Sequence, residues 1–422
     1  MANTLGFVFR ALRHRNYRLF FGGQSISLIG TWMQQIALNW LVYRLTGSAM
    51  LLGLVGFTSR IPTFLLAPFA GVMADRWNRH RMLIITQVLS MVQAMILAAL
   101  VLTNRIAVWH IITLSIFLGL VNAVDIPTRQ SFVPDMVEKR EDLGNAIALN
   151  SSIVNGARLI GPSIAGVLIA TLGEGLCFLL NGLSFIAVIA ALKAMRIEHR
   201  ERDAANSHVI EGLKEGFSYA FGFAPIRSVL LLLALVSLMG VPYSVLMPVF
   251  AEKILHRGPE AFGFLLGATG VGALAGTLYL ASRKSVLGLG RIIVIASTIF
   301  GIGLIGFSLS RVFWLSLCFM LLTGFGMMVQ MASSNTILQT LVEEDKRGRV
   351  MSIYTMAFVG MVPFGSILAG SLATNLGAPN TILIGGMICI LGAILFGRKL
   401  PSLRKIARPI YVKKGILPQD LA

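Results

Sequence analysis

The fold is decided by a short charged stretch, GVMADRWNRHR, at residues 71–81. An apolar run over 50–74 leads into it, and a second apolar run over 82–103 follows it. At a rise of about 1.5 Å per residue, each run is long enough to cross the hydrocarbon core of a bilayer as a helix. The stretch is therefore predicted to be a turn at a membrane surface, and its arginines place that surface on the cytoplasmic side.

Composition agrees with a membrane protein. Of the 422 residues, 56% are hydrophobic and only 13% are charged, whereas about a quarter of the residues of a soluble domain are charged. The formal net charge of +18 is concentrated at the ends of the apolar runs. That distribution is a topology signal, and it argues against nucleic acid as a partner.

Reading the chain for apolar runs of helix length predicts an all-α integral membrane protein with twelve transmembrane helices. Most Lys and Arg residues lie on the same side as the N-terminus, so both termini are expected in the cytoplasm. The runs are 17–44, 50–74, 82–103, 107–126, 143–171, 175–195, 225–251, 260–281, 291–309, 313–340, 349–376 and 379–397.

An internal repeat divides these runs into six and six. The segment GPSIAGVLIATLG at 161–173 matches GSILAGSLATNLG at 365–377, with six of thirteen positions identical. The repeat predicts two pseudo-symmetric six-helix bundles. We expect an N-terminal bundle over 1–195, a cytoplasmic linker over 196–224, a C-terminal bundle over 225–397 and a basic cytoplasmic tail over 398–422.

The turn resembles the loop signature between helices two and three of the major facilitator superfamily. The matching residues are Gly71, Asp75, Arg76, Arg79 and Arg81. Asn78 stands where the family usually has Gly, and Asn tolerates a left-handed turn conformation. The resemblance implies the fold of this superfamily, in which two bundles rock about a central cavity, and a loop that stabilises one conformation by docking near Gly348.

A second resemblance points to export. The fifth run carries a pattern similar to the Gly-Pro signature of exporters in the superfamily, at Gly156, Arg158, Gly161, Pro162 and Gly166. Together with the segments 125–137 and 145–150, it resembles the enterobactin-exporter and drug-efflux branch. An ordinary kinked packing helix is the alternative interpretation of the same glycines and proline.

Asp125, Arg60 and Arg158 are the charged residues of the apolar runs that bear on function. Asp125 is the candidate for proton coupling, because carriers driven by protons need a titratable group, but an ion pair with Arg129 one turn further on explains it equally well. Arg60 and Arg158 lie deep, with no carboxylate at similar depth. We expect the two arginines to face water, backbone carbonyls, Asp125 or an anionic substrate group. A structural role is favoured for Arg158, and Arg60 is the better candidate for substrate contact.

Polar side chains within the runs predict the lining of a substrate cavity, or hydrogen bonds between helices. On the first run, Ser27, Thr31, Gln35 and Asn39 recur every four residues. Spans one, four, seven and ten line the cavity in the superfamily, which favours Gln35, Asn39, Tyr243 and Gln330. Asn155 shares a face of the fifth run with Arg158.

No catalytic motif is present, so an enzyme is not expected, and neither a cofactor nor a metal is expected. The sequence predicts a monomeric secondary transporter of the bacterial inner membrane that exports small organic molecules by alternating access, coupled to protons. A dedicated siderophore or metabolite exporter and a lipid flippase are alternatives. A non-transporting scaffold is the least favoured.

Overall fold

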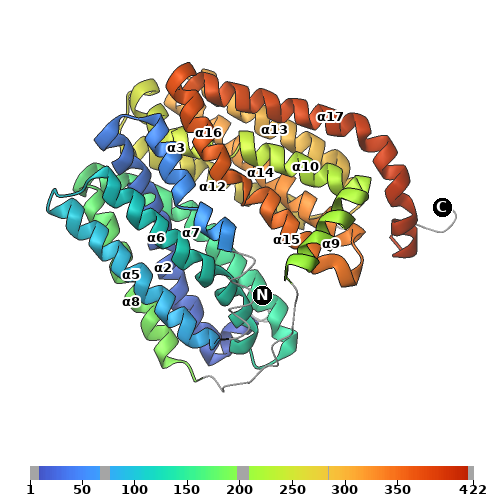
Figure 1. Cartoon of the computed structure of the whole chain (residues 1–422), viewed down its shortest axis with the longest axis horizontal. Helices are drawn as coiled ribbons and strands as arrows, with labels where there is room; N and C mark the ends of the chain where they lie inside the picture. Colours follow the sequence, from blue (N-terminus) through green and yellow to red (C-terminus); the bar gives the residue numbers. More distant parts are fainter. Residues whose placement is uncertain (1–8, 67–76, 197–208, 284, 417–422) are drawn as a thin grey trace. The chain divides into compact units, whose positions relative to one another are not determined.

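The computed structural model describes residues 9–66, 77–196, 209–283 and 285–416 (Figure 1). This part of the chain is helical and contains no strand, which confirms the predicted all-α class. Its α-helices are α2 (Arg15–Thr46), α3 (Ala49–Thr58), α5 (Arg79–Leu102), α6 (Val108–Phe132), α7 (Leu143–Leu172), α8 (Glu174–Ala194), α9 (Val209–Gly222), α10 (Ala224–Met239), α11 (Tyr243–Val249), α12 (Pro259–Ala281), α13 (Leu289–Leu309), α14 (Phe313–Leu341), α15 (Arg347–Phe358), α16 (Met361–Leu376) and α17 (Ala378–Lys413).

Eleven described segments are long and apolar enough to cross a membrane. They correspond to the second to twelfth predicted spans. The first predicted span forms the 32-residue helix α2, which is long enough to span but is not among the eleven. Its mean hydropathy is lowered by basic residues at both ends and by a series of glutamines and serines along its length.

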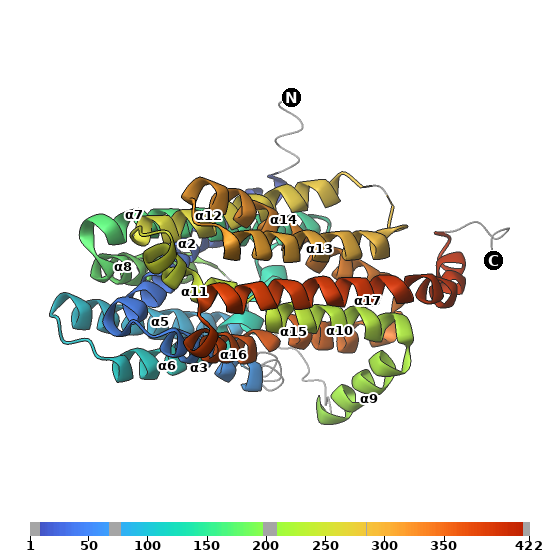
Figure 2. The same cartoon turned by 90° about the horizontal axis from the view of Figure 1, so that it is seen from above.

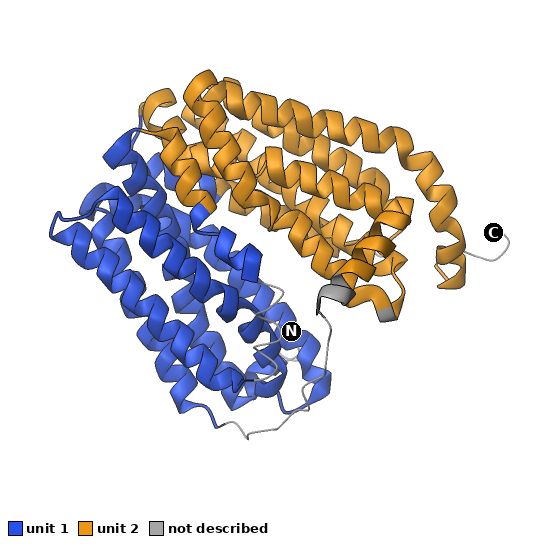
Figure 3. Ribbon diagram, viewed as in Figure 1, with its two compact units in different colours: residues 1–47, 58–206, 257–267 blue, residues 48–57, 207–256, 268–422 orange. Residues whose placement is uncertain are grey.

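By close packing, the chain divides into two compact units (Figure 3). Unit 1 consists of residues 1–47, 58–206 and 257–267, and unit 2 of residues 48–57, 207–256 and 268–422. Within unit 1, α8 packs against both α2 and α5. Within unit 2, α13 lies beside α14 and α17, as Figures 1 and 2 show. The predicted bundle limits stay a prediction, and the units differ from them at 48–57 and 257–267.

Glycine contacts explain why these two short segments join their units. A Cβ atom on Gly166 of α7 would lie 3.0 Å from the Cα of Gly263, within unit 1. A Cβ on Gly370 of α16 would lie 3.0 Å from the Cα of Gly53, within unit 2. Only glycine allows such a close approach of two helices. Gly166 and Gly370 are matched positions of the internal repeat, so the repeated sequence makes equivalent contacts in both units.

The second half of the predicted linker is a helix of unit 2. Glu215 of α9 forms a 2.7 Å ion pair with Arg349 of α15, and the Lys346 ammonium lies 4.6 Å from the ring centroid of Tyr219. Most of the predicted tail is likewise helical, because α17 continues to Lys413. Residues 197–208, between the two units, lie outside the described part.

The charged turn is described only from Trp77 onward, so Gly71, Asp75 and Arg76 lie outside the described residues. Asn78, which stands where the family usually has Gly, has an extended backbone with φ −66° and ψ 105° and does not use the left-handed conformation that Asn tolerates. Its side chain instead accepts a 3.0 Å hydrogen bond from the Arg81 N–H and caps α5. Arg79 pairs with Asp135 at 3.6 Å, which ties the start of α5 to the end of α6. Arg81 is exposed.

Candidate functional site

Arg60 occupies a break in the second span. Pro62 has no N–H to donate to the carbonyl of Thr58, and α3 ends at Thr58. Ser59 and Arg60 form a turn before the helix resumes at Ile61. Arg60 follows Ala49 by eleven residues, or about 16 Å of helix, and its side chain is exposed. A charge at this depth is costly unless it faces water or a ligand, so Arg60 stays a candidate functional residue.

Arg158 lies at the middle of the 30-residue helix α7. Its guanidinium carbon is 5.7 Å from the ring centroid of Trp32 on α2, close enough for a cation–π interaction. Gly161 makes this approach possible, because a Cβ there would lie 2.6 Å from the Cβ of Trp32. By contrast, a Cβ on Gly156 would meet nothing within 4 Å. The exporter-like pattern therefore combines Gly161 and Gly166, which pack helices, with Gly156, which does not.

Arg60 and Arg158 both belong to unit 1. Their like charges are close enough to interact. Among the described residues, no carboxylate lies within ion-pair distance of either guanidinium. The pair is thus a concentration of positive charge inside the membrane-spanning region, and it favours an anion between or beside the two side chains.

Asp125 on α6 has the opposite environment. Its carboxylate accepts hydrogen bonds from the hydroxyl of Thr86 at 2.8 Å and from the amide of Gln87 at 2.7 Å. Its other oxygen lies 3.6 Å from Arg129, so the ion pair that the spacing predicts is present. Only 5% of Asp125 is exposed. Three partners from two helices satisfy this buried charge.

The other predicted lining residues belong to both units. On α2, Gln35 and Asn39 are half-buried, as is Asn155, which donates to the Ser151 carbonyl at 2.9 Å. In unit 2, Tyr243 is buried with its ring edge toward Phe300. Gln330, also in unit 2, is 1% exposed, and its amide nitrogen has no hydrogen-bond acceptor.

The sequence reasoning missed a buried amide network in unit 1. Gln34 donates to Gln93 at 2.9 Å and accepts from Asn181 at 2.8 Å, which joins α2 to α5 and α8. A signal was present: Gln24, Ser27 and Gln34 are spaced by three and seven residues, and all are buried. The four-residue spacing instead selected the row containing Gln35.

Metal binding has little support in the part of the chain that the structure describes. There, no three His, Cys, Asp or Glu side chains gather closely enough to hold an ion. Cys177, Cys318 and Cys389 are free thiols. The candidate residues of unit 1 are two cations, several amides and one aromatic ring.

The sequence profile of the transmembrane secretion effector family matches residues 8–409. The chain belongs to this family of the major facilitator superfamily. The staphyloferrin A transporter of Staphylococcus aureus (strain NCTC 8325 / PS 47) is 30% identical over 389 residues, which cover 91% of this chain and 96% of that relative. The multidrug efflux pump Tap of Mycolicibacterium fortuitum is 25% identical over 381 residues, covering 88% and 92%.

The fold is shared with solved transporters. The crystal structure of a point mutant of the nucleoside transporter NupG aligns with a TM-score of 0.71 over 92% of this chain and 99% of that chain, at 14% identity. These findings together identify a multi-pass membrane transporter that exports small molecules, not an enzyme.

Proposed function

We propose that this transporter exports a small organic anion whose negative group binds Arg60 and Arg158. One observation carries the proposal: two neighbouring cations lie within the membrane-spanning region, and no described carboxylate neutralises them. Family members export small molecules. In this proposal the exported molecule is an anion, and its negative charge balances the positive charges of Arg60 and Arg158.

The binding step follows from the geometry of unit 1. An anion at the two guanidinium groups removes their mutual repulsion and forms charge-assisted hydrogen bonds, each contributing about 1.5–3 kcal/mol. Loss of one arginine should therefore weaken binding roughly 10-fold to 100-fold. Trp32 holds Arg158 in place from α2, and the half-buried Gln35, Asn39 and Asn155 supply weaker polar contacts.

The transport cycle in this proposal is alternating access with both termini in the cytoplasm. The loop bearing Gly71, Asp75 and Arg76 stabilises one conformation, as the family signature implies. Asp75→Asn should reduce export while membrane insertion stays normal. Equal export by the variant and the wild type, at equal protein levels, would remove the loop from the mechanism.

We also propose that export is coupled to protons, with Asp125 as the candidate group. Among the described residues, it is the carboxylate that lies well inside a span. Thr86, Gln87 and Arg129 hold it in the present conformation, so uptake of a proton requires these contacts to open in another conformation. Asp125→Asn should make export insensitive to a protonophore, and unchanged sensitivity in a folded variant would exclude this role.

The substrate proposal is tested by export assays with pairs of compounds that differ in charge alone, such as a carboxylate and its methyl ester. Arg60→Ala should lose export of the carboxylate at least 10-fold and keep export of the ester. Arg227→Gln removes an exposed cation of unit 2 and serves as the matched control. Equal loss of the carboxylate and the ester would overturn the anion proposal.

Substrate breadth separates two versions of this function. One relative is named for a single metabolite and another for multidrug efflux. A dedicated exporter should protect cells against one compound class, whereas a multidrug exporter should change the accumulation of several unrelated compounds in the same deletion strain.

A further inference from the structure

Unit 2 contains a cavity of about 280 Å³ that is separate from the arginine pair of unit 1. Its walls come from the beginnings of α10 and α13, the end of α14 and the extension of α17 beyond the last predicted span. Because three of these walls are helix ends, the cavity lies at the level where spans leave the bilayer. Its size is close to the lower end of small-ligand sites, about 300 Å³.

The inner wall of the cavity is apolar. Val229, Leu289 and Ile337 line it and are buried. Phe396 and Leu403 of α17 line it as well and are 6% and 8% exposed. Such a wall suits a hydrocarbon chain, and it offers little to a free inorganic ion.

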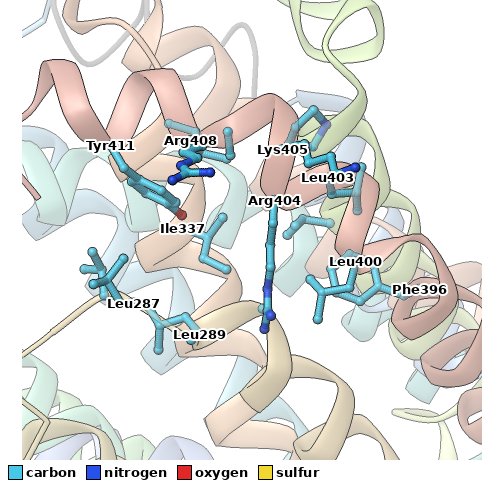
Figure 4. A pocket seen from close by; sticks show the side chains of 17 residues that line it. Leu287, Leu289, Ile337, Phe396, Leu400, Leu403, Arg404, Lys405, Arg408 and Tyr411 are labelled. Atoms are coloured by element: carbon cyan, nitrogen blue, oxygen red, sulfur yellow. The ribbon is translucent and has the colours of Figure 1, made fainter. Parts of the chain in front are cut away.

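The outer rim is cationic. Arg404, Lys405 and Arg408 line the cavity from α17, together with Tyr411. Figure 4 shows Arg408 and Tyr411 above Leu287 and Leu289, with the Arg404 side chain extending from α17 down toward the level of Leu289. No described residue that lines the cavity is acidic.

The charge of this rim is not neutralised by its neighbours. Residues 398–414 include seven Lys or Arg and no Asp or Glu. Of the acids that follow α14, Glu343 pairs with Lys346 at 2.8 Å and Glu344 with Arg347 at 3.7 Å. No described carboxylate pairs with Arg404, Lys405 or Arg408.

The α17 extension is held over the cavity by its own contacts. Lys414 donates to the carbonyl oxygens of Thr340 at 2.7 Å and Val342 at 3.2 Å, just beyond the cavity at the end of α14. The buried Leu403 and Ala407 face inward one turn apart. The rim is therefore a built part of unit 2.

We propose that this cavity binds an anionic phospholipid, with one acyl chain against the apolar wall and the phosphate headgroup at Arg404, Arg408 and Tyr411. Basic side chains at the membrane surface attract anionic headgroups by about a 5-fold gain in affinity per charge. The apolar wall adds the requirement for a hydrocarbon chain. The inference is independent of the exported substrate, because none of the residues that line the cavity belongs to the arginine pair.

Native mass spectrometry of the full-length protein in detergent tests the proposal. The probes are phosphatidylglycerol and phosphatidylcholine with identical acyl chains. Phosphatidylglycerol should bind at least 10-fold more tightly than phosphatidylcholine. The double variant Arg404→Gln/Arg408→Gln should lower the affinity for phosphatidylglycerol about 30-fold. The matched control is Lys399→Gln/Lys413→Gln, which removes two exposed charges from the same helix outside the cavity and should change the affinity less than 3-fold.

A second variant tests the apolar part while keeping every charge. Ala407→Trp fills the cavity from α17 and should lower the binding affinity for phosphatidylglycerol at least 5-fold. The comparison uses variant protein that elutes as a single peak in size-exclusion chromatography. Equal binding of the two lipids, equal losses in the two double variants, or full displacement of phosphatidylglycerol by millimolar inorganic phosphate would each overturn the proposal.

Discussion

Two charged regions of unit 1 differ in how their charge is satisfied. Asp125 receives two hydrogen bonds and an ion pair from Thr86, Gln87 and Arg129. Arg60 and Arg158 meet each other's like charge and no described carboxylate. Buried charges are tolerated when they are partnered. A satisfied charge stabilises the helices around it, whereas an unsatisfied one is available to a ligand.

The largest expected effect on stability comes from breaking the satisfied region. Asp125→Ala leaves Arg129 without its carboxylate and the buried Gln87 amide without its acceptor, whereas the Thr86 hydroxyl keeps the Leu83 carbonyl. The free energy of unfolding should fall by about 3 kcal/mol, measured by chemical unfolding in detergent micelles. Ser151→Ala, at an exposed position, is the control. A loss below about 1 kcal/mol would mean that the cluster does not stabilise unit 1.

A smaller effect should follow from moving Arg158 without removing it. Gly161→Ala places a methyl group 2.6 Å from the Cβ of Trp32. Helix α7 must then shift away from α2, which should lower the free energy of unfolding by about 1–3 kcal/mol. Gly156→Ala meets nothing within 4 Å and should be neutral or slightly stabilising. Thermal unfolding and anion export, measured for both variants, should separate them, and equal behaviour would contradict the packing role of Gly161.

The smallest expected effect on stability comes from the unsatisfied region. Arg60→Gln removes a repelled cation, so the unfolding temperature should stay the same or rise. Arg129→Gln also removes one positive charge, but it takes a partner from Asp125 and should lower that temperature. If both variants lose stability equally, Arg60 has a structural partner and the comparison fails.

Apolar length and basic residues at helix ends predicted the class and the sequence of spans, because each span must be apolar enough to enter lipid. Apolar length and charge predicted the polar residues of the candidate site less well. Gln34 and Gln35 are neighbours on α2, yet only Gln34 is buried and joins three helices. Which side of a helix meets its neighbour depends on packing, so periodicity alone did not identify the buried row that contains Gln34.

The sequence pattern also failed to predict which residue caps a helix and where a helix ends. The sequence pattern gave no sign that Asn78 caps α5. The residues after 397 look like a basic tail in sequence, but they continue α17, because buried side chains such as Leu403 and Ala407 anchor them to unit 2. Tertiary contacts, rather than local composition, determine where this helix ends.

The most direct test of the account is the ratio of binding affinities for a carboxylate compound and its methyl ester, measured by calorimetry on the purified transporter. The arginine pair predicts a ratio of roughly 10 to 100 in favour of the carboxylate. In Arg60→Gln/Arg158→Gln the ratio should fall to about one. A wild-type ratio near one, or an unchanged ratio in the double variant, would contradict the claim that these two cations bind the exported anion.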